Sequence, residues 1–242
     1  MIDLSQRSTR PEVMDDDDVP TDIYARCQRE LALINRLTLT HRPILRWLDR
    51  ATRELPRGAA VSILDVACGH GDLLRTIGTW AARRGLNAAL SGIDLNPRSG
   101  VVAAAATPPD MKIDYRTGNI FAYEPDPPPD FVVTSQFTHH LTDAELVRFI
   151  GWLDTHAHRG WFIADLHRHA LAYYGFPVLA WLARFHKIIR SDGMISVARG
   201  FRRTEWQRAL EDTGLAEVRD VAVTWHIPFR YGIGRLKAGR PA

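Results

Sequence analysis

The sequence predicts an α/β fold built on a doubly wound, mostly parallel sheet. Short apolar runs alternate with helical patterns between residues 60 and 166, and this alternation is typical of parallel strands joined by helices. A glycine-rich turn, "ACGHGD", directly follows the first apolar run, "SILDV". With 242 residues, the chain is long enough to bury one sizeable core.

The alternation predicts each element of the first two thirds of the chain. Apolar positions recur at helical spacing from residue 23 to residue 53, where Pro43 marks a break between two helices. The expected strands are 60–66, 88–95, 112–119, 130–136 and 160–166, and the expected helices between them are 71–85, 97–106 and 143–157.

The last third changes character. Residues 169–190 are apolar enough for a partly buried helical segment. A further helix over 204–214 would open with a capping box of Thr204 and Gln207 and end at Gly214. Two closing strands are expected over 216–229 and 230–238. We therefore expect a disordered acidic tail (1–20) followed by one domain (21–242). Within this domain we expect a helical cap (23–53), a ligand-binding core (60–166), a lid (167–200) and a C-terminal part (201–242).

Composition limits the expected location of the protein and its expected partners. The longest apolar run is far shorter than a bilayer span, and the N-terminus lacks the apolar stretch of a signal peptide, so a cytoplasmic protein without a membrane span is expected. Cys27 and Cys68 have no paired spacing, which gives neither a disulfide framework nor a metal framework. The net charge of +3 comes from scattered arginines, so nucleic acid is an unlikely partner. Oligomeric state stays open.

The glycine turn indicates a nucleotide-like ligand without a phosphate. A dinucleotide fingerprint requires glycines at the positions of Ala67, Gly69 and Asp72, and two of the three are missing. Asp72 would also repel a pyrophosphate at the helix N-terminus. Asp94, at the end of the second expected strand, is placed to accept hydrogen bonds from ribose hydroxyls.

The stretches "ILDVACGHGDLL", "SGIDLNP", "TGNIFAY", "DFVVTSQFTHHL" and "FRRTEWQRALEDTGL" resemble, in order and spacing, the class I S-adenosylmethionine-dependent methyltransferases. The similarity covers residues 60–236 and is greatest to the branch that acts on small molecules, such as quinones, phenols and polyketides. It implies a seven-stranded Rossmann-like sheet and S-adenosyl-L-methionine as the cofactor.

The resemblance also implies roles for individual residues. The implied cofactor-binding residues are Asp65, Ala67, Gly69, Gly71, Asp94, Leu95, Asn119, Ile120 and Gln136. Ala67 stands where the family usually has glycine, which is tolerable if its φ is negative. Asn119 stands where aspartate is more common, and it could instead only hydrogen-bond its own loop.

His139 is the first candidate for a general base, because it follows the fourth strand at the edge of the expected substrate space and an imidazole with a pKa near neutrality suits proton removal. His167 and Asp165 are secondary candidates, and packing or capping is the alternative for His139. His140, Tyr173 and Tyr174 are expected to contact an aromatic substrate. The pairs His156/His158 and His167/His169 lack a matching carboxylate or cysteine, so no metal site is expected.

Three functions remain at this stage. The preferred function is methyl transfer to a small molecule, with a phenolic or polyketide-type hydroxyl as the acceptor. The second is methylation of RNA or protein, although "TSQFT" (134–138) stands where amino-group methyltransferases often carry an Asn-Pro-Pro-aromatic signature. The third is a non-enzymatic nucleotide-binding module or a nicotinamide oxidoreductase.

Overall fold

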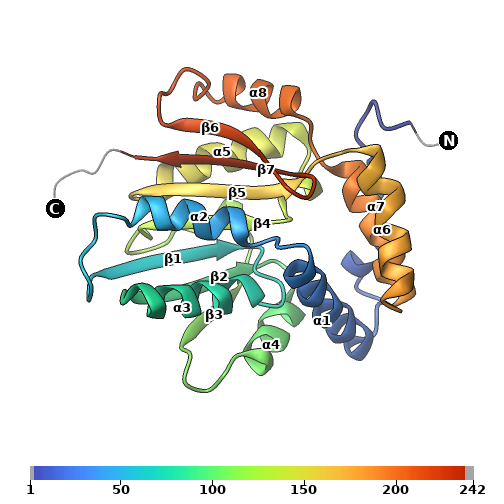
Figure 1. Cartoon of the computed structure of the whole chain (residues 1–242), viewed down its shortest axis with the longest axis horizontal. Helices are drawn as coiled ribbons and strands as arrows, with labels where there is room; N and C mark the ends of the chain where they lie inside the picture. The colour runs from blue at the N-terminus through green and yellow to red at the C-terminus, as the bar shows by residue number, and fades with distance from the viewer. Residues whose placement is uncertain (1–2, 238–242) are drawn as a thin grey trace.

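The computed structural model describes residues 3–237, and its centre is a seven-stranded sheet (Figure 1). The strands are β1 (Ala60–Val66), β2 (Asn87–Asp94), β3 (Ile113–Thr117), β4 (Phe131–Ser135), β5 (Gly160–Leu166), β6 (Val221–His226) and β7 (Arg230–Leu236). Their order in the sheet is β3-β2-β1-β4-β5-β7-β6. β1 to β5 are parallel, and β7 is antiparallel to both β5 and β6. The predicted α/β class is therefore confirmed. The strand order reverses beside β1 and β4, where such sheets hold their ligands.

The helices begin and end at recognisable caps. They are α1 (Thr21–Leu37), α2 (Arg42–Ala51), α3 (Asp72–Arg84), α4 (Pro97–Ala106), α5 (Asp143–His156), α6 (Ala170–Leu182), α7 (Lys187–Arg199) and α8 (Arg203–Asp212). Thr142 and Glu145 form a capping box at the start of α5, and Gly85 ends α3 with a φ of +69°. The capping box expected at Thr204 and Gln207 is wrong, because α8 starts earlier and Glu205 accepts the backbone N–H of Arg202 at 2.6 Å.

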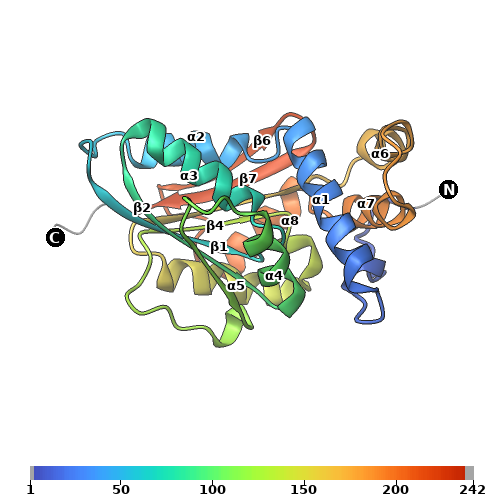
Figure 2. The same ribbon diagram turned by 90° about the horizontal axis from the view of Figure 1, so that it is seen from below.

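Helices cover both faces of the sheet (Figure 2). α2 and α3 pack on one face, and α5 and α8 pack on the other. Trp47 of α2 lies 5.6 Å from Phe131 and 5.5 Å from Phe162, measured between ring centroids. Burying one such side chain contributes about 1.5–3 kcal/mol. α2 is thus part of the core, and of the expected 23–53 cap only α1 lies over the ligand edge.

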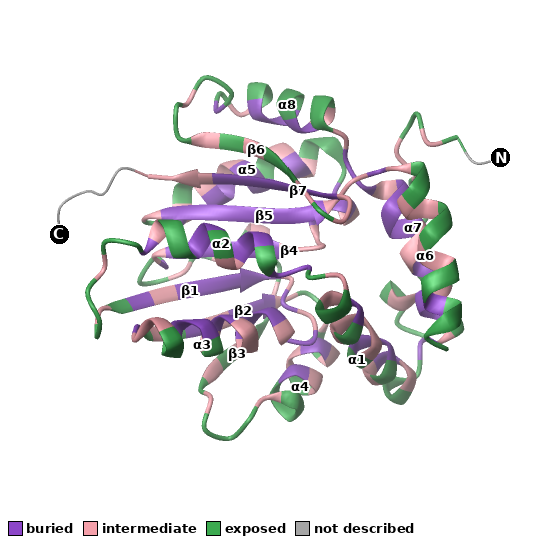
Figure 3. Ribbon diagram, in the orientation of Figure 1, coloured by how far each residue is buried: buried purple, intermediate pink, exposed green. Residues whose placement is uncertain are grey.

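A third group of elements lies at the carboxyl ends of the strands (Figure 1). α1, α6, α7 and the N-terminal segment share their own apolar cluster, which includes Cys27, Ile34, Phe185 and Ile189. Figure 3 shows β5 buried along almost its whole length, whereas α6 keeps an exposed outer face. The lid expected over 167–200 corresponds to these two helices, α6 and α7.

The N-terminal segment is packed against the domain, contrary to the expected disordered tail over 1–20. Asp192 of α7 accepts the backbone N–H groups of Val13 and Met14 at 3.0 and 2.8 Å. Glu12 is only 7% exposed. The sequence reading missed this packing because a run of aspartates close by dominates the local composition. Residues 1–2 of that tail and residues 238–242 of the C-terminal part lie outside the described residues.

No helix among residues 3–237 combines the length and the apolarity needed to cross a bilayer.

Candidate active site

A cavity of about 1170 Å³ opens at the carboxyl ends of β1, β2 and β4. Its walls come from α1, the loop after β1, the N-terminal segment, α6 and the start of β7. The structure places these expected cofactor residues on its lining: Asp65, Ala67, Gly69, Asp94, Leu95, Asn119, Ile120 and Gln136. Gly71 is not on the lining, but a Cβ there would lie 2.3 Å from the Tyr115 hydroxyl. It therefore permits the turn rather than touching a ligand.

The loop after β1 is held in a left-handed conformation. Ala67 has a φ of +58° and Gly69 a φ of +49°. The expectation that Ala67 keeps a negative φ is wrong, because its N–H must reach the carbonyl of Ile93, which it does at 2.8 Å. This hydrogen bond fixes the loop against the end of β2. The left-handed backbone conformation that it requires costs Ala67 free energy that a glycine would not lose.

Asp94 organises the junction between β1 and β2. Its Oδ2 accepts the backbone N–H of Gly69 at 2.8 Å, and its Oδ1 accepts that of Asn96 at 2.9 Å. Burial raises the pKa of this carboxyl. Each carboxylate oxygen has a further lone pair, so Asp94 can still accept hydrogen bonds from two hydroxyl groups of a ligand.

Three carboxyl groups lie close together in this half of the cavity, and Asp72 is the one whose pKa is lowered. Asp65 is 2% exposed, and its pKa is raised well above its usual value by burial and by the charges of Asp72 and Asp94. Burial alone would raise the pKa of Asp72, but hydrogen bonds from His41 and Asn35 lower it to about 2. Such a site favours a ligand that carries positive charge and disfavours phosphate.

The far wall of this half is apolar. Ile120 is buried, and Leu95, although 71% exposed, lies at the cavity edge. Oδ1 of Asn119 accepts the N–H of Phe121 at 3.0 Å, so this atom does bond its own loop. A flat ring system would fit between these side chains and the loop.

The other half of the cavity contains a buried cation. Arg230, the first residue of β7, is 4% exposed, and its Nη2 lies 2.6 Å from Thr40 Oγ1 and 3.3 Å from Gln136 Oε1. Within residues 3–237 no carboxylate oxygen lies within 4 Å of it, and its Nε has no hydrogen-bond partner. Burial lowers the pKa of Arg230 to about 10. A buried guanidinium of this kind is suited to an anionic group.

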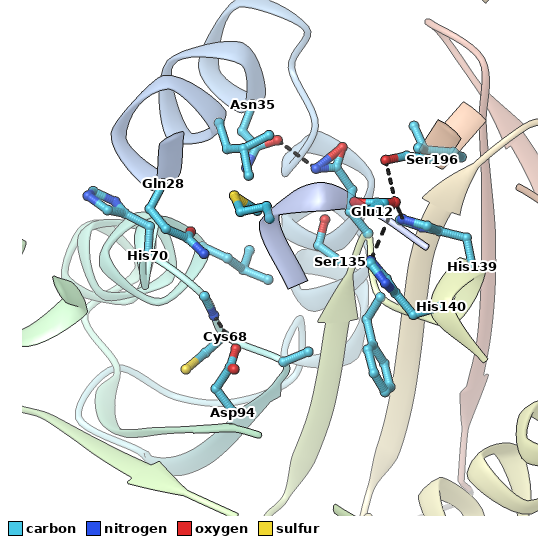
Figure 4. A pocket seen from close by; sticks show the side chains of 18 of the residues that line it. Glu12, Gln28, Asn35, Cys68, His70, Asp94, Ser135, His139, His140 and Ser196 are labelled. Atoms are coloured by element: carbon cyan, nitrogen blue, oxygen red, sulfur yellow. Dashed lines mark hydrogen bonds and ion pairs between the residues drawn. The ribbon is translucent and has the colours of Figure 1, made fainter. Parts of the chain in front are cut away.

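His139 lies between two carboxylates, of which Figure 4 shows Glu12. Its Nδ1 is 2.8 Å from Asp165 Oδ1, and its Nε2 is 3.4 Å from Glu12 Oε1. Burial alone would lower the pKa of His139, but Asp165 and Glu12 raise it to about 10. The near-neutral pKa expected for a base is therefore wrong for this arrangement, because both ring nitrogens face carboxylates.

Figure 4 also shows His140 and Ser196 beside Glu12. Nε2 of His140 is 3.8 Å from the same Glu12 oxygen, and its Nδ1 is 3.1 Å from Asp15. Ser196 donates to Glu12 Oε1 at 2.7 Å. His139, His140 and Glu12 all line the cavity, whereas Asp165 lies behind His139 and acts through it.

Besides Asp165, three expected substrate or catalytic residues lie away from the cavity. Tyr173 and Tyr174 are on the outer side of α6, where Tyr174 is 52% exposed. The inner side carries Ala172, Phe176 and Leu179 instead, because residues three and four apart share a helix face. His167 accepts a hydrogen bond from Trp225, and burial lowers its pKa to about 4.

Sequence reasoning missed Glu12, Arg230 and Ser196. They belong to the N-terminal segment, β7 and α7, and only the fold brings them to one cavity. Glu12 is followed by the apolar residues Val13 and Met14, which is a weak sign of burial, but no local pattern links it to His139.

The fold and the site agree with the resemblance seen in the sequence. The parallel sheet with its antiparallel β7, the left-handed loop after β1 and the acidic β2 end have the arrangement that the resemblance to class I S-adenosylmethionine-dependent methyltransferases implies. Residues 63–160 match the family model described as a methyltransferase domain.

Part of the chain is similar in sequence to curated methyltransferases. The chain is 30% identical to the trans-aconitate 2-methyltransferase of Mycobacterium tuberculosis over 128 residues. The aligned stretch covers 52% of this chain and 43% of the relative. The chain thus spans less than half the length of the curated relatives it matches.

Two solved structures share the fold. The magnesium protoporphyrin IX methyltransferase from Synechocystis PCC 6803 with bound SAH has a TM-score of 0.56 at 15% identity, over 92% of this chain and 90% of the other. The plantazolicin methyltransferase BpumL in complex with SAH has a TM-score of 0.59 at 13% identity, over 94% and 88%.

Proposed function

We propose that this protein transfers a methyl group from S-adenosylmethionine to an oxygen atom of a small molecule. The observation that carries the proposal is the division of one cavity into two halves. The half at Asp65 and Asp94 suits a cationic adenosine ligand, and the half at His139 and Arg230 suits a polar acceptor.

The residues of the first half fit the cofactor. Asp94 would accept hydrogen bonds from the ribose, Ile120 and Leu95 would enclose the adenine, and the carboxyl group of Asp65 would lie near the methionine part. When bound, the cofactor supplies a methyl group activated by its positive sulfur. A phosphate-bearing dinucleotide would meet the negative potential of Asp72 and lack the glycines that its pyrophosphate needs.

The chain's own residues align the acceptor and exclude water. α1, α6 and the N-terminal segment cover the cavity, which fits an enclosed small molecule better than RNA or a folded protein. His139 faces the acceptor half with a protonated ring, so its proposed contribution is to stabilise negative charge on the acceptor oxygen. Asp165 is a positioning residue that orients this ring.

A phenolic hydroxyl is our preferred acceptor, because its pKa of about 10 allows solvent water to take its proton, and protonated His139 then stabilises the phenolate that attacks the methyl group. A carboxylate is a second candidate, favoured by the buried Arg230 without a carboxylate partner in the described chain. The relative named for trans-aconitate points in the same direction.

Labelled cofactor distinguishes these candidates. The purified protein is incubated with labelled S-adenosylmethionine and a panel of phenols, carboxylic acids and cell extract, and the products are separated by size. Mild alkali then releases the label from esters as methanol but leaves aryl ethers intact. Label found solely in RNA or protein would refute the proposal.

A His139→Ala variant tests the acceptor half. We expect turnover to fall by about 10²–10³-fold with cofactor affinity nearly unchanged, since the histidine lies away from the ribose site. His156→Ala is the matched control, because His156 pairs with Glu124 on the surface. Equal loss in both variants would remove His139 from the mechanism.

A further inference from the structure

The side chains of Glu12, His139 and His140, here called the Glu-His-His cluster, converge on one point at the cavity wall (Figure 4). Each side chain offers one atom that could bind a metal ion, and these three atoms lie within 4.8 Å of one another. Glu12 comes from the N-terminal segment, and the two histidines follow β4. His139 is 2% exposed and Glu12 7% exposed, so the point is largely shielded from solvent.

The separations in the cluster suit a shared ion better than hydrogen bonds. Nε2 of His139 and Nε2 of His140 lie 3.4 and 3.8 Å from the same Glu12 oxygen. Both distances exceed the 2.7–3.2 Å of an N–H···O hydrogen bond. Ligands bound about 2.0–2.2 Å from one ion at tetrahedral or octahedral angles lie about 3–3.5 Å apart. The cluster therefore needs only small adjustments to hold an ion.

Each histidine is oriented through its other nitrogen. Nδ1 of His139 is 2.8 Å from Asp165, and Nδ1 of His140 is 3.1 Å from Asp15. Metal-binding histidines characteristically bind a carboxylate in this way, which fixes the ring and leaves Nε2 for the metal. Arg199 adds to this order by donating to the backbone carbonyls of both histidines, at 3.0 and 2.9 Å.

The charges of the cluster also favour a cation. Asp165 and Asp15 each face the Nδ1 atom of one histidine, and Glu12 is a further buried carboxylate that accepts a hydrogen bond from the neutral hydroxyl of Ser196. Two arginines lie nearby: Arg7 binds Asp143 and backbone carbonyls, and Arg199 binds backbone carbonyls, so in the described chain neither is hydrogen-bonded to Glu12. A divalent ion would compensate the negative charge of Glu12 and bind the Nε2 lone pairs of the two histidines.

We propose that the Glu-His-His cluster binds one divalent transition-metal ion through Nε2 of His139, Nε2 of His140 and Oε1 of Glu12. Two imidazoles and one carboxylate form a donor set that suits Zn²⁺, Mn²⁺ or Fe²⁺ and not Ca²⁺ or Mg²⁺. Three protein ligands leave further positions open toward the cavity. With the ion bound, the positive charge that faces an acceptor oxygen is the ion's own and no longer that of protonated His139.

Metal binding can be measured without any turnover. The tag-free full chain is stripped with chelator and dialysed against Zn²⁺ or Mn²⁺, and bound metal is counted per chain. Co²⁺ then serves as an optical probe, because its visible absorption bands report nitrogen and oxygen ligands. We expect one ion per chain, and a spectrum that changes in a His140→Ala variant.

Variants make the assignment specific. Glu12→Gln and His140→Ala should each weaken metal binding by at least about 10-fold, and Asp165→Asn by about 10–100-fold through loss of ring orientation. His156→Ala should bind the metal as the unmodified chain does. Circular dichroism and the melting temperature of each variant show that it is folded.

Two results would overturn the proposal. One is the absence of stoichiometric metal in the folded chain, in which case the cluster serves only to hold the N-terminal segment in place. The other is metal that Glu12→Gln and His140→Ala leave unchanged. Cofactor binding is measured separately, so failure of the metal site and failure of methyl transfer give different results.

Discussion

The carboxylate of Asp94 accepts the backbone N–H of Gly69 at 2.8 Å and thereby joins the end of β2 to the loop after β1. Asp94→Ala removes both this bond and the expected contact with the ribose. We expect cofactor affinity to fall by about 10–150-fold, which corresponds to the 1.5–3 kcal/mol lost with a hydrogen bond to a charged group. Calorimetry with S-adenosylhomocysteine measures it, with the exposed Asp212→Ala as control. NAD binding of comparable strength in the unmodified protein would contradict the assignment.

Arg230 allows the acceptor's charge to be tested. Arg230→Gln keeps a polar side chain but removes the guanidinium that faces the second half of the cavity. If the acceptor is a carboxylate, KM for it should rise by about 10–100-fold while kcat changes less. Phenolic acceptors should be nearly unaffected. Arg235→Gln, on the same strand but paired with Asp154, is the matched control. A similar rise in KM for both acceptor classes would mean that Arg230 is only structural.

Ala67 offers a stability test at the cofactor loop. Its φ of +58° costs an L-residue about 1–2 kcal/mol, whereas glycine adopts it freely but loses more entropy on folding. We expect Ala67→Gly to raise the free energy of unfolding by about 0.5–1 kcal/mol in urea titrations. Ala222→Gly, in β6, should instead lower it. Destabilisation by Ala67→Gly would show that its methyl group packs more favourably than its backbone conformation costs.

Asp72 makes stability depend on pH in the acid range. The hydrogen bonds from His41 and Asn35 hold its folded pKa at about 2, below the usual 3.8. A lowered folded pKa gives stability that is complete above pH 4 and disappears as the pH falls through about 2. Asp72→Asn should therefore cost about 2 kcal/mol at pH 7 and less at pH 3. Asp212→Asn should change neither value. A cost that stays equal at both pH values would assign the effect to packing.

The sequence predicted the ordered core well because local patterns determine it. β1, β5 and α4 have the predicted bounds, since apolar runs closed by glycine, or by Pro97 after the capping Asn96, leave little freedom. The cofactor half was predictable for the same reason, because its residues end successive strands.

The acceptor half was not predictable in this way. Arg230 looks like an ordinary strand residue until β7 inserts beside β5, and Glu12 looks like part of a polar tail. Tyr173 and Tyr174 lie on the wrong side of α6 because composition does not reveal which face of a uniformly apolar helix turns inward.

The N-terminal segment contributes Glu12 to the cavity wall while its own backbone is held by Asp192 of α7. Closure of the cavity and occupancy of the Glu-His-His cluster therefore share one side chain. If packing of the segment strengthens ion binding by a certain free energy, the bound ion stabilises the packed segment by the same free energy. Removing the ion would then loosen the segment beside the acceptor half, so the affinity for the ion and the opening equilibrium of the cavity become linked quantities.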